Sequence, residues 1–97
     1  MLGGVLITRI PPDARIKPHT DASWHVDYYD KFYLSLQAAP GATFHTDTEA
    51  IEPKVGDLWR FDNRVRHWVT NDSRQSRVTL IMCIRTDLFE SHFRARF

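Results

Sequence analysis

The chain has 97 residues, and its 13 lysine and arginine residues against 12 aspartate and glutamate residues give a net charge of +1. This length allows one compact domain, and the balanced charge argues against a nucleic-acid-binding protein and against a polybasic membrane-surface protein. No apolar run approaches the roughly 20 residues that span a bilayer. We therefore expect a single domain over residues 1–97 with no nucleic-acid or membrane partner.

The single cysteine, Cys83, cannot form an internal disulfide and cannot alone build a thiolate metal site. The first residues also lack the basic segment that is typical of a signal peptide. Both features favour a reducing, cytoplasmic location.

Short alternating hydrophobic runs separated by turn residues dominate the sequence, a pattern that is typical of an antiparallel sandwich or barrel. Short segments rich in Pro, Gly, Asn and Asp predict turns at residues 11–13, 39–41, 53–56, 62–64 and 71–73. Between them the strands are predicted at residues 3–10, 15–19, 31–37, 43–46, 49–52, 57–61, 67–70 and 76–85. Residues 20–30 lack periodicity and are expected to form a loop. A short helix is expected over residues 86–93, where Thr86 can cap the first turn.

His19 and Asp21 lie two residues apart just after a predicted strand. Because residues i and i+2 of an extended chain project to the same side, the imidazole and the carboxylate can converge on one point. Together with His67 they can form the arrangement of two histidines and one carboxylate that non-haem Fe(II) oxygenases use, whereas a structural zinc site has four ligands, usually with cysteine. A surface histidine beside a loop aspartate is the alternative interpretation of this pair.

Arg77 lies on a largely apolar predicted strand, residues 76–85. An unpaired buried charge is very costly, so the guanidinium needs a partner. A carboxylate of a small ligand, bound in a bidentate manner, would satisfy it. Pairing with a surface acid such as Asp72 is an equal alternative from the residues alone.

Three segments in the second half of the chain carry a recognisable pattern: Gly56-Asp57-Leu58-Trp59-Arg60-Phe61-Asp62, His67-Trp68-Val69-Thr70-Asn71-Asp72-Ser73 and Arg77-Val78-Thr79-Leu80. With the proline-rich turn at 10–12, the His19-x-Asp21 pair and residues 31–36, they resemble the aspartyl/asparaginyl β-hydroxylase family. The resemblance covers about residues 7 to 87 in order and with suitable spacing.

This resemblance implies an all-β double-stranded β-helix, a cupin-like jelly-roll of about eight short strands. It also implies that His19, Asp21 and His67 bind Fe(II), and that Arg77 holds the distal carboxylate of the co-substrate 2-oxoglutarate. In the family an arginine and a histidine two residues apart also contact 2-oxoglutarate. Lys31 and Tyr33 stand at those positions here, and both can donate to a carboxylate.

The function that the resemblance implies is hydroxylation, coupled to decarboxylation of 2-oxoglutarate to succinate. The expected substrate is an Asp or Asn side chain of a polypeptide, or a free amino acid. Two alternatives stay open: a metal cupin enzyme that does not use 2-oxoglutarate, and a truncated, non-catalytic β-sandwich that binds a ligand.

The two strands that carry the co-substrate residues have a row of large apolar side chains on their opposite face: Phe32, Leu34, Leu36, Val78, Leu80, Met82 and Ile84. In the resembled family, helices that precede the first strand cover this surface, and such helices are missing here. An uncovered apolar face of this size exceeds what monomers normally tolerate. We therefore expect either a homodimer through this face or a chain that is part of a longer protein.

Overall fold

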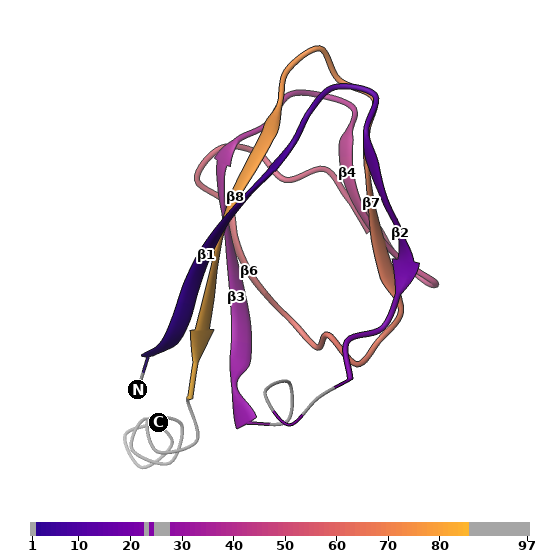
Figure 1. Cartoon of the computed structure of the whole chain (residues 1–97). Helices are drawn as coiled ribbons and strands as arrows, with labels where there is room; N and C mark the ends of the chain where they lie inside the picture. Colours follow the sequence, from indigo (N-terminus) through magenta and orange to yellow (C-terminus); the bar gives the residue numbers. More distant parts are fainter. Residues whose placement is uncertain (1, 23, 25–27, 86–97) are drawn as a thin grey trace, which may run out of the picture.

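The fold consists of two four-stranded antiparallel sheets that face each other (Figure 1). The computed structural model describes residues 2–22, 24 and 28–85. Within them the strands are β1 (Leu2–Ile10), β2 (Arg15–His19), β3 (Asp30–Gln37), β4 (Ala42–Thr46), β5 (Ala50–Ile51), β6 (Leu58–Phe61), β7 (His67–Asn71) and β8 (Arg77–Ile84). The predicted strands are thus confirmed within one or two residues at each end, while the helix predicted over residues 86–93 lies outside the described residues.

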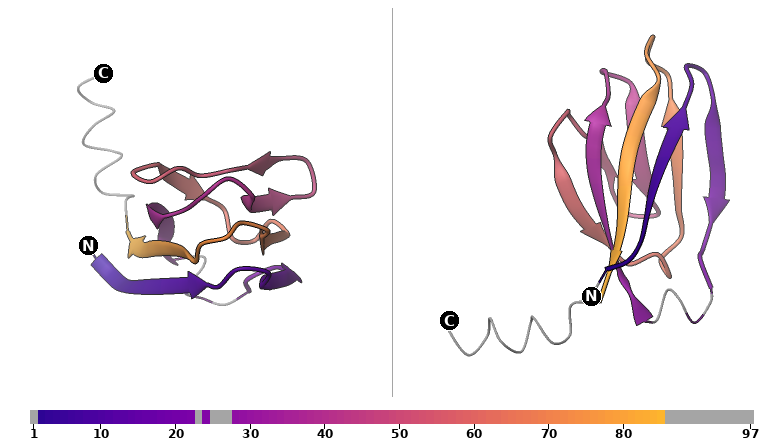
Figure 2. Two further views of the ribbon diagram at one scale, coloured as in Figure 1. Left: turned by 90° about the horizontal axis from the view of Figure 1, so that it is seen from above. Right: turned by 60° about the vertical axis from the view of Figure 1, so that its left-hand side comes forward.

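One sheet has the strand order β1-β8-β3-β6 and the other has the order β2-β7-β4-β5. The chain crosses between the sheets at every connection except the β4–β5 hairpin (Figures 1 and 2). This winding of paired strands is the double-stranded β-helix, or jelly-roll, that was predicted. No helix among the described residues is long and apolar enough to cross a membrane.

Two of the predicted turns have a backbone conformation that explains their glycines. Gly41 has φ +103°, and a side chain there would also meet the backbone of Asp72 at 3.1 Å. Gly56 has φ +90°, a conformation that other residues rarely adopt. Both glycines therefore fix sharp connections between strands of the sandwich.

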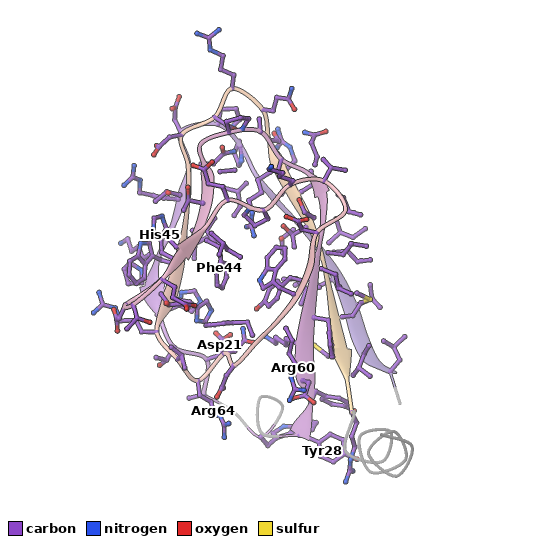
Figure 3. All side chains as sticks on the ribbon, turned by 180° about the vertical axis from the view of Figure 1, so that it is seen from behind. Asp21, Tyr28, Phe44, His45, Arg60 and Arg64 are labelled. Atoms are coloured by element: carbon purple, nitrogen blue, oxygen red, sulfur yellow. The ribbon has the colours of Figure 1, made fainter. Side chains whose placement is uncertain are left out.

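The core between the sheets is small and largely aromatic. Its buried centre consists of Ile10, Phe44 and Val69, and Phe61 packs against them. Because successive residues of a strand face opposite sides, Phe44 points between the sheets while its neighbour His45 points to the outside (Figure 3). Trp59 lies on the inner face and stacks on Tyr33, with ring centroids 5.3 Å apart.

The outer face of the sheet β1-β8-β3-β6 is apolar. Strand pairing aligns on this face the side chains of Val5, Ile7, Phe32, Leu34, Leu58, Leu80 and Met82. Val5, Ile7 and Leu58 are 55%, 62% and 60% exposed. The expected row of apolar residues on β3 and β8 therefore continues onto β1 and β6 on either side.

Candidate metal centre

The two candidate histidine ligands lie side by side on the inner face of one sheet because β2 and β7 pair in that sheet. His19 ends β2 and His67 begins β7, and the two residues are direct partners in the antiparallel ladder. Ile16 pairs with Val69 on the same inner face, although His19 lies three positions after Ile16 and simple alternation would place it on the other face. A register shift between these two residues adds one residue to β2, as a β-bulge does, and so keeps both side chains inside.

The ring orientation of each histidine is fixed by a backbone carbonyl. The Nδ1 atom of His19 lies 2.8 Å from the carbonyl oxygen of Lys17, and that of His67 lies 2.8 Å from the carbonyl oxygen of Val65. A carbonyl oxygen can only accept a hydrogen bond, so Nδ1 carries the proton in both rings. The lone pair of Nε2 is then free on each ring, which is the arrangement of most metal-ligating histidines.

Asp21 completes a group of three. One carboxylate oxygen of Asp21 lies 3.5 Å from Nε2 of His19, and the other lies 3.7 Å from Nε2 of His67. The three ligand atoms lie within 4.8 Å of one another, so the group can hold one metal ion. These separations are longer than hydrogen bonds, and they leave room for an ion between the groups. The fold therefore brings together the three residues that were predicted as metal ligands.

Burial differs sharply among the three residues. The side chain of His67 is 6% exposed, whereas those of Asp21 and His19 are 29% and 40% exposed. His67 also packs against the rings of Phe44 and Phe61. The group thus has a rigid aromatic wall on one side and an accessible edge at His19, as a site with open coordination positions requires.

Arg77 lies in the same cavity as this group. The cavity has a volume of about 130 Å³, and its lining includes His19, Asp21, His67 and Arg77. Arg77 is 4% exposed, and burial lowers the pKa of its guanidinium. Asp72 instead lies 3.8 Å from Arg15 at the surface, so the alternative pairing of Arg77 with Asp72 is wrong.

Among the described residues, Arg77 has no hydrogen-bond acceptor and no ion-pair partner. Thr79 lines the same cavity, and its buried hydroxyl has no hydrogen-bond partner among residues 2–22, 24 and 28–85. The same holds for the hydroxyl of Ser35, the residue paired with Thr79 across the sheet. A buried cation beside unsatisfied hydroxyl donors suits an anion that enters the cavity. These residues therefore fit a carboxylate ligand.

Lys31 and Tyr33 line the cavity on β3, on the same face as predicted. Nζ of Lys31 lies 3.6 Å from a carboxylate oxygen of Asp21, so this lysine contacts the metal group itself. Tyr33 is 6% exposed, and burial raises the pKa of its hydroxyl to about 12, against the lowering effect of a hydrogen bond from Asn63. Tyr33 thus keeps its proton at any ordinary pH.

Another histidine, His45, is not part of the metal group. His45 lies on the outer face, where its ring stacks on Trp68 and its Nε2 lies 2.9 Å from the Thr70 hydroxyl. His25 lies outside the described residues. Two cavity residues were not predicted from the sequence. Asn63 was assigned only to a turn. Thr79 was given no role, although it lies two residues from Arg77 on the same strand and therefore on the same face.

A family comparison covers nearly all of the described chain. A model of the aspartyl/asparaginyl β-hydroxylase family matches residues 1–86. These residues include every member of the metal group and of the cavity that contains Arg77. No curated protein matches the sequence significantly.

Solved structures with the same fold are distant in sequence. A predicted oxalate decarboxylase from Thermotoga maritima is 18% identical with a TM-score of 0.65, and the match covers 87% of this chain and 67% of that one. A cupin protein from Bacteroides fragilis is 19% identical with a TM-score of 0.65, over 86% and 65% of the two chains. A cupin domain from Bordetella pertussis is 17% identical with a TM-score of 0.62, over 87% and 88%. At these identities the likeness shows a cupin-type fold.

Proposed function

The chain belongs to the aspartyl/asparaginyl β-hydroxylase family, and on that basis we propose that it is an Fe(II)- and 2-oxoglutarate-dependent hydroxylase. Its metal ligands in this proposal are His19, Asp21 and His67. Neutral imidazole and carboxylate ligands suit Fe(II), and three protein ligands leave positions open for co-substrate and oxygen. When bound, the metal and 2-oxoglutarate supply the oxidising chemistry of the reaction.

One observation carries the proposal: a buried guanidinium, unpaired within the part of the chain that the structure describes, shares a small cavity with the three ligand residues. A metal site alone does not explain why Arg77 is buried at a cost in free energy. A dicarboxylate explains it, because one carboxylate can bind the metal while the other neutralises Arg77. The Thr79 hydroxyl then has an acceptor as well.

The remaining cavity residues have supporting roles in this proposal. Tyr33 donates a hydrogen bond to the co-substrate, and Lys31 adds positive charge beside Asp21. The aromatic rings of Phe44 and Phe61 hold His67 in place and exclude water from behind it. The proposed substrate is an Asp or Asn side chain of a polypeptide, or a free amino acid, as family membership suggests.

The direct test is succinate formation from 2-oxoglutarate in the presence of Fe(II) and oxygen. The wild type and His45→Ala are expected to form succinate, because His45 lies on the outer face away from the cavity. His67→Ala is expected to form none above the protein-free background. Hydroxylation of candidate peptides and amino acids is then followed by a mass increase of one oxygen atom.

The outcomes separate the alternatives. Metal-dependent turnover without consumption of 2-oxoglutarate would indicate a different metal cupin enzyme. Equal metal affinity in the wild type, His19→Ala and His67→Ala would indicate a binding module without a catalytic metal. Either result would overturn the proposal.

A further inference from the structure

Asn63 connects the metal group to the co-substrate side of the cavity. It follows β6 in a tight turn and is only 3% exposed. Its side-chain nitrogen donates to a carboxylate oxygen of Asp21 at 3.0 Å and to the hydroxyl oxygen of Tyr33 at 2.6 Å. Its backbone carbonyl also accepts from the backbone N–H of Asp21 at 2.9 Å. Asp21 is therefore tied to this one residue by both main chain and side chain.

The carboxylate decides which way the Asn63 amide points. An ionised carboxylate has only acceptor atoms, so the NH₂ group of the amide must face Asp21. The reverse orientation would place two acceptor oxygens against each other in a buried site, at a substantial cost. The same NH₂ group has a second N–H, and the geometry directs it to Tyr33.

The amide orientation then fixes the direction of the Tyr33 hydroxyl. Because the Tyr33 oxygen accepts from Asn63, its own proton cannot be used in that hydrogen bond and must point elsewhere. No acceptor for this proton is found within the described ranges, and Tyr33 lines the cavity that contains Arg77. A co-substrate carboxylate in the cavity would supply the acceptor.

We propose that Asn63 is a positioning residue that holds Asp21 in its metal-binding orientation and directs the Tyr33 hydroxyl proton into the co-substrate cavity. This inference rests on the proposed function, because it assigns Asn63 a role toward both the metal and the dicarboxylate. One N–H of the Asn63 amide bonds the metal ligand Asp21. The other bonds the Tyr33 oxygen and so leaves the Tyr33 proton free to bond the co-substrate.

The first test measures metal affinity alone, from the visible absorption of Co(II) added to the metal-free protein. Asn63→Ala is expected to weaken Co(II) binding about 10- to 100-fold, which is typical when a partner of a metal ligand is removed. Asn63→Leu keeps the branched shape of the side chain but removes its hydrogen bonds, and it should show the same loss of Co(II) affinity if the alanine variant folds poorly. The matched control is Asn71→Ala, since Asn71 is fully buried and, among the described residues, its side chain bonds the backbone of Ile10 and Gln75 and the turn residue Ser73, not the metal group.

The control separates positioning from general structural support. Asn71→Ala is expected to lose stability and to bind Co(II) within about threefold of the wild type in its folded fraction. Unchanged Co(II) affinity in both Asn63 variants would overturn the proposal. An equal loss of affinity in Asn71→Ala would also overturn it, because the effect would then follow stability.

The second test measures 2-oxoglutarate affinity of the Co(II)-loaded protein without oxygen. Tyr33→Phe is expected to bind Co(II) normally and 2-oxoglutarate about tenfold more weakly, since a hydrogen bond to a charged group is lost. Asn63→Leu at saturating Co(II) should weaken 2-oxoglutarate binding as well. If Tyr33→Phe binds 2-oxoglutarate more weakly while Asn63→Leu binds it as tightly as the wild type, Asn63 does not orient the Tyr33 hydroxyl. If the wild type binds Co(II) but no 2-oxoglutarate, the proposed function fails and the metal-positioning result still stands by itself.

Discussion

Replacing Arg77 by methionine should make the ligand-free protein more stable, which is the reverse of the usual effect of a core substitution. Arg77 is 4% exposed, and among the described residues no group pairs with its charge. Methionine keeps an unbranched apolar stem of similar length and removes the guanidinium. Folding of the variant therefore no longer carries the free-energy cost of burying an unpaired charge.

The expected gain follows from this burial. Apolar replacement of buried charged groups is often neutral or stabilises proteins by roughly 1–4 kcal/mol. Water that enters the cavity of about 130 Å³ can hydrate part of the guanidinium, so the low end of this range applies. We expect about 1–2 kcal/mol for Arg77→Met. In a domain of this size each kcal/mol corresponds to roughly 4–8 °C in Tm.

Thermal unfolding with and without ligand is the assay. With Mn(II) and no oxygen, 2-oxoglutarate at about 100 times its Kd should stabilise the wild type by ~2.7 kcal/mol and Arg77→Met by far less. The order of stability of the two proteins should therefore reverse when the ligand is added. Arg74→Met, at an exposed turn position, is the matched control and should change stability by less than about 0.5 kcal/mol.

Two results would refute this reasoning. A ligand-free Arg77→Met protein that is less stable than the wild type would mean that Arg77 has a structural partner in the fold. Equal stabilisation of both proteins by 2-oxoglutarate would mean that the guanidinium does not bind the co-substrate.

Three further predictions concern the cavity and the outer sheet face. Thr79→Val removes a buried hydroxyl that has no partner in the described part of the chain, so the ligand-free protein should keep its stability. The 2-oxoglutarate affinity, measured by calorimetry, should fall about tenfold, and an unchanged affinity would remove Thr79 from the site. Burial raises the pKa of Tyr33 from 10.0 to about 12, because the folded protein favours the protonated hydroxyl. The stability that the protonated Tyr33 contributes is therefore complete below pH 10 and is lost as the pH rises through 12. In urea unfolding between about pH 9 and pH 11 the wild type should lose ~1.3 kcal/mol more than Tyr33→Phe, and equal losses would contradict this burial effect. A homodimer through the outer face should dissociate in the double variant Val5→Lys/Ile7→Lys, and a wild type that sediments as a monomer and binds no hydrophobic dye would refute it.

The strands could be predicted because their hydrophobic alternation is local and their turns carry specific residues. Gly41 and Gly56 are examples, since each occupies a backbone conformation that favours glycine. The pairing of His19 with His67 could be proposed from residue type and from the family resemblance. The shift in register that keeps Ile16 and His19 on the same face could not be predicted, because simple alternation places residues three apart on opposite faces.

The contacts around the metal group could not be predicted from the sequence as well as the ligands themselves. Asn63 lies between two turn-forming residues, and turn chemistry alone accounts for an asparagine there. Its contacts with Asp21 and Tyr33 join residues 42 and 30 positions apart, and only the fold reveals them. The choice between a ligand and Asp72 as the partner of Arg77 also required the structure, because it depends on where Asp72 lies.

Anaerobic titration of the metal-free protein with Fe(II) and 2-oxoglutarate, followed by visible absorption, tests most directly whether one dicarboxylate bridges the metal group and Arg77. We expect a weak charge-transfer band that requires both Fe(II) and 2-oxoglutarate and is absent in His67→Ala. In Arg77→Met the band should need at least about tenfold more 2-oxoglutarate. No band in the wild type, or the same 2-oxoglutarate dependence in Arg77→Met, would contradict this bridging.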